Sequence, residues 1–306
     1  MRDDRKLEQA ARAAWLSYVA RRTQDEIAQE MGVSRQTAQR LVAQALAAGL
    51  VKVRIDHPLT SCFSLEKDLQ KRFGLKMASI TPAAAGQTGV AMAVADFIES
   101  HLQQGAPITL AVGAGRTLRA AVTQMARIDC PQHRIASLTG NISADGSAAY
   151  YNVLFSLSDI VTARSFPLMV PVIATSKEER DALHRQPGNI RVMEMTKHAQ
   201  VALIGLGSMG SEAPLAKDGF LTMAEILALQ EQGAVGEILG HSYDINGKFL
   251  PKNERVASAE LPSTERALVV AAAFGPDKRD SVFGALHTGV INGLITDETT
   301  AASLLK

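Results

Sequence analysis

A loop bracketed by two glycines is the part of this sequence best suited to hold an anion. The loop is Gly113-Ala114-Gly115-Arg116-Thr117, and it follows an apolar run at residues 108–112 that is typical of a strand. Two glycines let backbone N–H groups converge on an anion, and the Arg116 guanidinium and Thr117 hydroxyl would add to the attraction. An ordinary tight turn between a strand and a helix explains the same residues equally well. Leu118 stands where a dinucleotide-binding motif needs its third glycine.

A second glycine-rich loop follows another predicted strand, at residues 201–205. Residues 205–210 read Gly-Leu-Gly-Ser-Met-Gly and match the spacing of a dinucleotide-binding loop. Pro214 and an Asp218-Gly219 turn interrupt the helix that should follow, and no acidic residue ends a second strand at the required distance. We therefore expect Gly205 and Gly207 to line a pocket for some other ligand.

Two charged residues could contact a hydroxylated or anionic ligand. Asp244 precedes an Asn246-Gly247 turn, where its carboxylate could accept hydrogen bonds from ligand hydroxyls or, equally well, stabilise an Asx-type turn. Lys278 precedes a predicted helix and could face a ligand or lie exposed. The histidines form no HxH or HExxH pattern and no G-x-S-x-G motif occurs, so the sequence offers no positive case for a metal, a cofactor or catalytic residues.

These loops belong to a region in which predicted strands and helices alternate from about residue 56. The predicted strands are 76–81, 108–112, 134–138, 201–205, 268–272 and 291–295, and the predicted helices are 65–73, 89–103, 117–127, 177–184, 222–232 and 280–288. Such alternation predicts an α/β fold with a doubly wound, mostly parallel sheet, whose ligands bind beyond the carboxyl ends of the strands.

The first 55 residues have a different, helical pattern. Residues 7–20 place Leu7, Ala11, Ala14, Trp15 and Tyr18 at helical spacing, as an inward face would be. Thr23 and Glu26 form a capping box that opens a short second helix, Gly32 supplies a tight turn, and Ser34 caps a third helix. Residues 50–55 then alternate as a strand does. The order predicts an all-α helix-turn-helix with a wing.

We expect the third helix to enter the major groove of DNA, where arginine can read guanine, glutamine can read adenine, and the helix start favours a phosphate. Its inward face is predicted to be Val33, Thr37, Leu41, Val42, Ala45 and Leu46. The predicted DNA contacts are Ser34, Arg35, Gln36, Thr37, Gln39 and Arg40, with Lys52 and Arg54 on the wing. A small helical bundle that binds no DNA would show the same helices and turn.

Composition supports two domains, 1–55 and 56–306, with a linker helix at about 58–74. The 306 residues are 46% hydrophobic and 21% charged, which is typical of a globular protein. Residues 1–55 carry ten Lys and Arg against six Asp and Glu, whereas the rest carries 22 against 25, so the basic charge is concentrated where DNA would bind. The chain has two cysteines and no apolar run of about 20 residues, so we expect a cytoplasmic protein without disulfides or membrane spans.

Taken together, the motifs resemble the SorC family of sugar-responsive bacterial transcriptional regulators over nearly the full length. The matching segments are 23–28, 33–35, 73–75, 113–117, 205–209, 233–238, Asp244 with Gly247, 255–256, 294–298, 300–301 and 304–305. The resemblance implies a winged helix-turn-helix joined to an effector domain similar to sugar-phosphate isomerases and glucosamine-phosphate deaminases. It also implies a homotetramer on double-stranded operator DNA and a sugar, polyol or sugar-phosphate effector.

The resemblance also assigns an effector pocket residue by residue. It implies Gly113, Gly115, Arg116, Thr117, Asp244 and Lys278, with Gly140, Asn141, Gly205, Gly207 and Glu237 as further candidates. We therefore predict a DNA-binding regulator of a carbohydrate-utilisation operon that is not an enzyme. The alternatives are an active sugar-phosphate isomerase or deaminase that carries a DNA-binding head, and a DNA-binding scaffold without a ligand.

Overall fold

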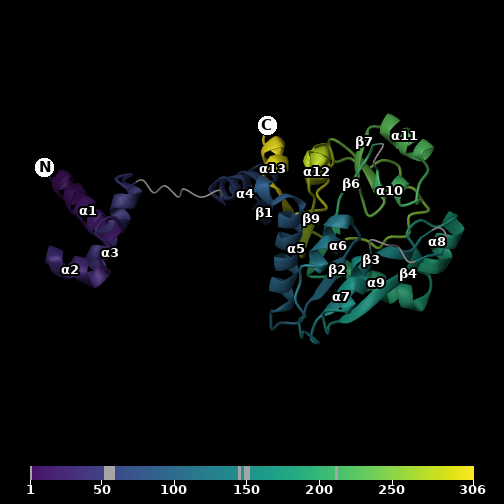
Figure 1. Ribbon diagram of the computed structural model, residues 1–306, viewed down its shortest axis with the longest axis horizontal. Coiled ribbons are helices and arrows are strands. Elements are labelled where there is room, and N and C mark those ends of the chain that lie inside the picture. The colour runs from purple at the N-terminus through teal and green to yellow at the C-terminus, as the bar shows by residue number, and fades with distance from the viewer. Residues whose placement is uncertain (1, 52–58, 144–145, 148–151, 211–212) are drawn as a thin grey trace. The chain divides into compact units, whose positions relative to one another are not determined.

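The protein divides into two compact units, Met1–His57 and Pro58–Lys306, here called the head and the body. The structure is a computed structural model that describes residues 2–51, 59–143, 146–147, 152–210 and 213–306 (Figure 1). No helix in these ranges is both long and apolar enough to cross a membrane.

The head contains three helices around a core of small and branched side chains. They are α1 (Arg2–Tyr18), α2 (Gln24–Met31) and α3 (Arg35–Ala47). The core consists of Ala10, Ala13, Ala14, Leu16, Ile27, Ala28, Ala38, Leu41, Val42 and Ala45. Buried alanines let α1 lie close against α3, where a larger side chain would hold the helices apart.

The predicted helix termini of the head are confirmed. Thr23 Oγ1 accepts a hydrogen bond from the Glu26 N–H at 3.4 Å, and Glu26 Oε2 accepts one from the Thr23 N–H at 2.8 Å, so the capping box is complete. Gly32 ends α2 with a φ of 66°, a left-handed conformation that glycine adopts without strain. These contacts fix the turn between α2 and α3.

The predicted inward faces of the head are partly wrong. Of the five residues expected to face inward on the first helix, only Ala14 is buried, and Trp15 is 57% exposed. Leu46 on α3 is also exposed, whereas Ala38, which we did not expect in the core, is fully buried. The error on α1 arises because helical spacing fits more than one face of a helix, and the face that is buried carries Ala10, Ala13 and Leu16 beside Ala14. The predicted wing strand, with Lys52 and Arg54, lies outside the described residues.

The body is built on a parallel sheet, as the alternating pattern predicts. In the described residues the strands are β1 (Met77–Thr81), β2 (Thr109–Val112), β3 (Arg134–Ile142), β4 (Arg164–Pro171), β5 (Val201–Gly205), β9 (Leu268–Ala272) and β10 (Gly293–Asp297). Their order is β1-β10-β9-β5-β2-β3-β4, and every pair is parallel. The chain therefore places the ends of β2, β5 and β9 side by side.

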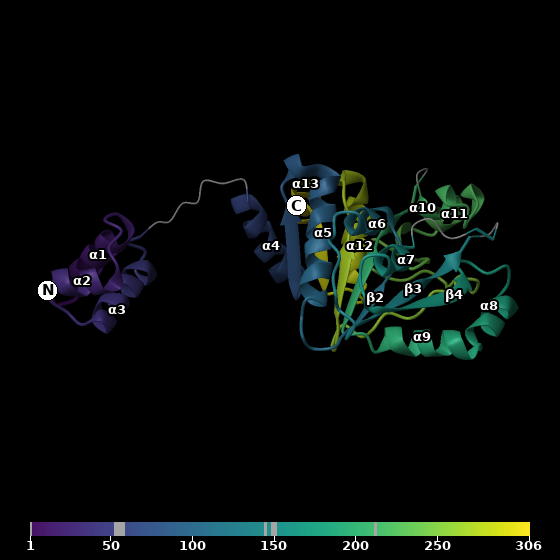
Figure 2. The ribbon, with the colours of Figure 1, turned by 60° about the horizontal axis from the view of Figure 1, so that its bottom comes forward.

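Helices cover both faces of this sheet, so alternate strand residues enter two cores (Figure 2). Leu110 and Val112 pack with α5 (Gly86–Leu102), α6 (Arg116–Val122) and α7 (Val153–Ser158). Ala111 lies in the other core, with α9 (Pro187–Lys197), α12 (Arg279–His287) and α13 (Glu298–Leu304). Four further elements are short: η1 (Ala83–Ala85), α8 (Lys177–His184), α10 (Pro214–Lys217) and η2 (Pro276–Lys278).

A small antiparallel sheet follows β5 and was not expected from the sequence. It consists of β6 (Gly207–Ser208), β7 (Ala234–Ile238) and β8 (His241–Asp244), with α11 (Met223–Glu231) preceding β7. Glu237 pairs with both Gly207 and Ser242 in this sheet. The second glycine loop therefore continues into a strand, instead of the helix of a dinucleotide site.

The helix α4 (Leu59–Phe73) begins the body; it starts earlier than the amphipathic segment 65–73 and agrees with the linker helix expected at about 58–74. It packs against β1 and α13. Glu66 Oε1 accepts a hydrogen bond from the Ile80 N–H at 2.9 Å, and Ser61 Oγ donates to Glu298 Oε1 at 2.6 Å. These contacts join the segment that follows the head to β1, an edge strand of the sheet, and to the last helix, α13.

Candidate functional site

The outward surface of α3 carries the predicted DNA contacts. Arg35, Gln36, Gln39 and Arg40 are all exposed. Ser34 and Thr37 hold the start of the helix: Ser34 Oγ accepts the Thr37 N–H at 3.2 Å and lies 2.9 Å from Thr37 Oγ1. The side chains that could reach base edges are thus the long ones, and the short ones are engaged in the cap.

The two arginines on this surface have no strong ion-pair partner among the described residues. Arg35 lies 3.4 Å from Asp25 of α2, and both side chains are about 70% exposed, so water screens the pair. Arg40 makes no ion pair with any described residue. Both guanidinium groups can therefore exchange their surroundings for phosphate or base edges at little energetic cost.

In the body, the two glycine loops lie against each other at the ends of β2 and β5. The Gly113 N–H donates to the Leu203 carbonyl at 2.9 Å. A side chain on Gly205 would place a Cβ 2.9 Å from the Ala114 carbonyl oxygen, and one on Gly115 would lie 3.7 Å from Gly205 Cα. Glycine is needed here because two backbones approach closely.

Lys278 reaches this junction from the end of β9. Its ammonium donates to the Leu206 carbonyl at 2.8 Å and to Ser208 Oγ at 3.3 Å. Burial lowers the pKa of Lys278, the nearby Glu237 charge raises it in part, and Arg116 lowers it further. Lys278 is therefore a partly desolvated cation beside the second glycine loop, not an exposed one.

Glu237 supplies the opposite charge and is half-buried. One carboxylate oxygen accepts the Gly240 N–H at 2.7 Å, and burial raises the pKa of Glu237 despite this bond and the charge of Lys278. A Cβ on Gly207 would lie 2.0 Å from Glu237 Oε1, so the carboxylate occupies the space that Gly207 leaves free. The second glycine of the loop thus makes room for an acid.

Arg116, at the start of α6, is engaged by an acid that the sequence did not point to. Its guanidinium donates to Asp218 at 2.8 Å, and Asp218 follows α10. The Arg116 side chain remains 40% exposed. A ligand anion at this loop would compete with Asp218 for the arginine.

Two other predicted pocket residues have evident structural roles. A Cβ on Gly140 would lie 2.3 Å from the Pro171 carbonyl oxygen, so this glycine permits close pairing of β3 and β4. Asn141 donates to Met169 Sδ at 3.4 Å, while its buried Oδ1 has no partner among the described residues. That unsatisfied oxygen is the polar atom of this pair that a ligand could use.

Asp244 lies at the end of the β7–β8 hairpin opposite to Glu237. Ala234 pairs with Asp244, whereas Glu237 pairs with Ser242 nearer the hairpin turn. Asp244 Oδ1 accepts the N–H groups of Asn246 and Lys248, each at 2.9 Å, which is the Asx-type turn we considered as the alternative. Its role toward an effector stays a prediction.

Asn152 is a polar residue near the loop that sequence reasoning missed. It caps α7 by accepting the Leu154 N–H at 3.0 Å, and its backbone bridges to Ala114. Its side-chain Nδ2 is buried without a partner among the described residues. Only the position of Asn152 before a helix signals its capping role, because the bridge joins residues 38 positions apart in the chain.

The cluster around the glycine loops can therefore bind a ligand with both an anionic and a hydroxylated part. Lys278 and Arg116 offer positive charge, Asn152 offers a donor, and Glu237 offers an acceptor. Such convergent polar groups beyond the strand ends are typical of ligand sites in parallel α/β sheets.

A helix-turn-helix head joined to a body with such a site defines a DNA-binding transcriptional regulator with a ligand-binding domain. The Sugar-bind family model, which describes a sugar-binding domain, matches residues 57–306, and a MarR-family model matches residues 8–58. The chain belongs to the SorC family of sugar-binding transcriptional regulators.

Individual relatives agree with this assignment over nearly the whole chain. The erythritol catabolism regulatory protein EryD of Brucella abortus (strain 2308) is 33% identical over 303 residues, covering 97% of this chain and 96% of the relative. The transcriptional regulator LsrR of Escherichia coli (strain K12) is 27% identical over 311 residues, covering 98% and 95%. The crystal structure of the full-length sorbitol operon regulator SorC from Klebsiella pneumoniae shares the fold, with a TM-score of 0.73 and 24% identity over 99% of this chain and 100% of that one.

Proposed function

We propose that the protein regulates a carbohydrate-utilisation operon and that a sugar, polyol or sugar phosphate controls its affinity for operator DNA. The observation that carries the proposal is the pair of opposite charges, Lys278 and Glu237, held in a desolvated setting beside two closely packed glycine loops. Burying charged groups costs free energy unless they have partners, so a site that retains them needs a reason beyond stability.

In this proposal the effector lies across the two loops. Its anionic or oxygen-rich end contacts Arg116, Thr117 and the backbone of Gly113 and Gly115, with Lys278 nearby. Its hydroxyls face Glu237, and Asp244, Gly140, Asn141, Gly205 and Gly207 complete the proposed pocket. For a phosphorylated effector, the phosphate would displace Asp218 from Arg116, because a dianion is the stronger competitor for a guanidinium.

The head contacts double-stranded operator DNA through α3. Arg35, Gln36, Gln39 and Arg40 face the major groove, Ser34 and Thr37 lie near a phosphate at the helix start, and Lys52 and Arg54 contact the backbone from the wing. Paired heads suit a two-fold operator, and we propose a homotetramer assembled through the body and acting in the cytoplasm. Sedimentation of the chain at micromolar concentration tests the assembly, and a monomer would contradict it.

A short series of contacts leads from the pocket to α4, the first helix of the body. The Gly275 N–H, three residues before Lys278, donates to Asp297 Oδ2 at 3.0 Å. Asp297 caps α13, accepting the Thr300 N–H at 3.0 Å, and the next residue, Glu298, accepts the bond from Ser61 of α4. Movement of Lys278 on ligand binding would therefore reach α4, which follows the head in the chain. A ligand can shift operator affinity only as far as it distinguishes the two conformations.

The test is a thermal-shift screen of sugars, polyols and their phosphates, followed by operator binding with each compound that stabilises the protein. Erythritol and its phosphates belong in the screen because a 33% identical relative is named for erythritol catabolism. A ligand at about 100 times its Kd should add about 2.7 kcal/mol of stability. We expect one chemical class to stabilise the chain and to change operator affinity, and the absence of any such class would contradict the proposal.

An active isomerase or deaminase is the second candidate. It is favoured by one observation, since a partly buried acid and a partly buried amine with shifted pKa values are common in catalytic sites. The compounds that stabilise the chain should therefore also be followed by NMR for turnover. We expect none, because the relatives over nearly the full length are named as regulators.

A further inference from the structure

Two adjoining cavities lie beside the β7–β8 hairpin, and neither is lined by any residue of the proposed effector pocket. Their volumes are about 540 Å³ and about 410 Å³. Five residues line both and so form a common wall: His241, Lys252, Asn253, Ser258 and Glu260. The larger volume lies within the range of about 300–1,000 Å³ that is typical of small-molecule sites.

The two cavities differ in chemistry. The larger one, here called the apolar cavity, is lined mainly by hydrocarbon from α11, the hairpin and the segment after it. Its apolar lining residues are Leu221, Ala228, Leu229, Ile238, Leu239, Phe249, Leu250, Pro251, Ala259, Leu261 and Val290. The smaller one, here called the polar cavity, is lined by charged and hydrogen-bonding side chains from α8, α9 and residues 252–260.

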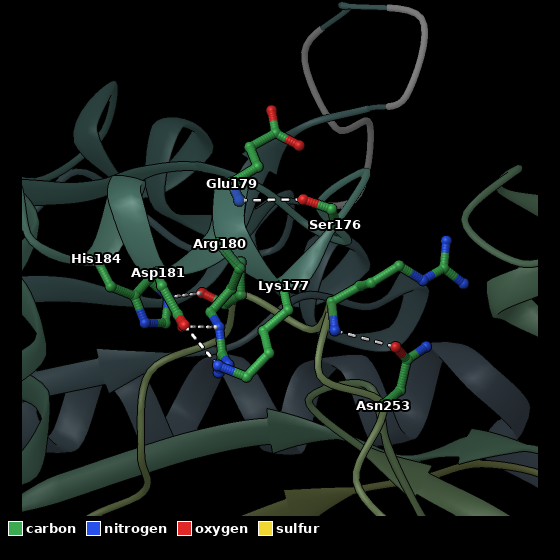
Figure 3. A network of polar contacts seen from close by, with 9 residues as sticks. Ser176, Lys177, Glu179, Arg180, Asp181, His184 and Asn253 are labelled. Carbon is green, nitrogen blue, oxygen red and sulfur yellow. Dashed lines mark hydrogen bonds and ion pairs between the residues drawn. The ribbon is translucent and has the colours of Figure 1, made fainter.

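A network on α8 holds the cationic wall of the polar cavity in place (Figure 3). Asp181 lies between two cations, with Oδ1 2.7 Å from Arg180 Nε and Oδ2 2.7 Å from Lys177 Nζ. His184 Nε2 lies 3.1 Å from the Ala257 carbonyl oxygen, which ties α8 to the segment that covers the cavity. Arg180 is thereby positioned with its terminal N–H groups unused by the described residues.

Two buried polar atoms at the common wall lack partners. His241 Nδ1 and Ser258 Oγ are enclosed and make no hydrogen bond to any described residue. Leaving such groups unsatisfied costs free energy, so they are rarely retained without a partner. Burial lowers the pKa of His241, and Lys252 and Arg180 lower it further, which means that the two charges acting on this ring are both positive.

The acids around the polar cavity do not cancel this positive field at His241. Glu194 is paired with His198 at 3.6 Å, Glu254 interacts with Lys177, and Glu260 is exposed. Lys252 is also exposed and makes no ion pair with a described residue, so it is free to turn toward an anion.

We propose that these cavities form a second ligand site for a small amphiphilic carboxylate, an anion with a hydrocarbon chain. The carboxylate lies at the common wall, where Lys252 and Arg180 supply charge and His241 and Ser258 donate hydrogen bonds. The hydrocarbon chain of the ligand fills the apolar cavity beneath α11. This site is separate from the effector pocket, and the proposal does not depend on what that pocket binds.

Sodium octanoate is the probe, titrated calorimetrically into the full-length protein. Inorganic phosphate serves as a control anion without a hydrocarbon chain, and 1-octanol as a control with the same chain length but without the charge. We expect octanoate to bind at least about tenfold more tightly than either, because it satisfies both cavities at once. Equal binding of phosphate or of octanol would overturn the amphiphilic assignment, and no octanoate binding would overturn the site.

Two pairs of variants locate the binding. Lys252→Met should weaken octanoate binding by about tenfold, the scale of one lost charge-assisted contact, whereas Lys248→Met, an equally exposed lysine that lines neither cavity, should not. Ala228→Trp should fill the apolar cavity and block octanoate, whereas Ala224→Trp, an exposed alanine on the same helix outside the cavity, should leave binding unchanged. Equal behaviour within either pair would contradict the proposal. Both target positions are exposed, so the melting temperature should stay close to that of the parent.

A spectroscopic readout is independent of affinity. In NMR titrations, octanoate should raise the pKa of His241, because an anion offsets the repulsion from Lys252 and Arg180. His101 hydrogen-bonds to Phe97 on α5, lines neither cavity, and serves as the reference. A His241 titration that octanoate does not move would place the ligand elsewhere.

Discussion

The head and the body hold their functional charges in opposite ways. Arg35 and Arg40 lie in water on a helix that is fixed by caps a few residues away, so the head gives up almost no stability to display them. Lys278 and Glu237 are partly desolvated, and the partners of Lys278 in the second glycine loop are 70 or more residues distant in the chain. A surface for a polyanion can be assembled from local rules, whereas a pocket for a small ligand must be assembled by the whole fold.

The largest effect is expected at the head. Reversing both Arg35 and Arg40 to Glu should weaken operator binding by at least about 100-fold, since each base or phosphate contact contributes about 1–3 kcal/mol and the reversal adds repulsion. Effector-induced stabilisation should be unchanged because the body is untouched. Electrophoretic mobility shifts over a series of salt concentrations measure the loss and its salt slope. Arg12→Glu makes the same charge change as either single reversal, at an exposed site on α1, and equal losses for Arg35→Glu, Arg40→Glu and this control would remove the assignment of α3.

The second effect tests how tightly the body site is packed. Gly207→Ala places a methyl group where the Glu237 carboxylate lies, so it should abolish the effector response and destabilise the protein by about 1–3 kcal/mol. Gly210→Ala is the matched control, because a Cβ there has nothing within 4 Å. Denaturant unfolding and thermal shifts with effector give the two readouts. A Gly207→Ala protein with normal stability and response would show that the carboxylate can move aside.

Asp244 combines a local contact with a proposed long-range one. It holds the turn at Asn246 and Lys248, and it is proposed to bind the effector as well. Asp244→Ala should cost about 1 kcal/mol of stability by removing the turn bonds to Asn246 and Lys248, and it should weaken the effector by about tenfold if a hydroxyl is also bound. Asp244→Asn keeps an acceptor for the turn and should restore the stability. Calorimetric titration of effector into both variants measures whether Asp244 binds the effector. An unchanged effector affinity would mean that Asp244 only stabilises the turn.

The smallest effect is a pH-dependent change in stability at Glu237. Its pKa in the folded protein is above the ordinary value of 4.5, so ionisation opposes folding. Stability from this group is complete below pH 4.5 and is lost as the pH rises through the raised pKa. Glu237→Gln should therefore melt at a higher temperature than the parent at pH 7.5, and the gap should close toward pH 4.5. A gap that widens on acidification would show that the folded protein favours the charged form.

Features that depend on local contacts were predictable from the sequence, whereas features that depend on distant contacts were not. The capping box of Thr23 and Glu26 and the cap at Ser34 were predictable because their partners lie three residues away. The inward face of α1 was wrong because helical spacing fits more than one face, and packing against α3 selects the one with Ala10, Ala13 and Leu16. The strand β10 begins two residues later than predicted because the Asn292 side chain bonds to Val269 N–H at 2.7 Å and to the Ala267 carbonyl at 2.8 Å, fixing a turn first.

The two glycine loops of the candidate site could be predicted from the sequence, but the contacts that these loops make with each other and with other elements could not. Glycine spacing after a strand marks residues 113–117 and 205–207 as places of close approach, but the sequence does not reveal that they touch each other. Asp218 and Asn152 were missed because their partners, Arg116 and Ala114, are brought to them by the packing of α10 and α7. Antiparallel β7 and β8 were missed because they are short and lie within a predominantly parallel pattern.

The β7–β8 hairpin carries Glu237 of the proposed effector pocket and, four residues later, His241 of the proposed carboxylate site. A ligand at either proposed site acts on strands that the other site also uses. Linkage then requires reciprocity: by whatever factor a carboxylate changes the affinity for the sugar, the sugar changes the affinity for the carboxylate. Occupancy of one operator would then report two metabolite concentrations as a single quantity.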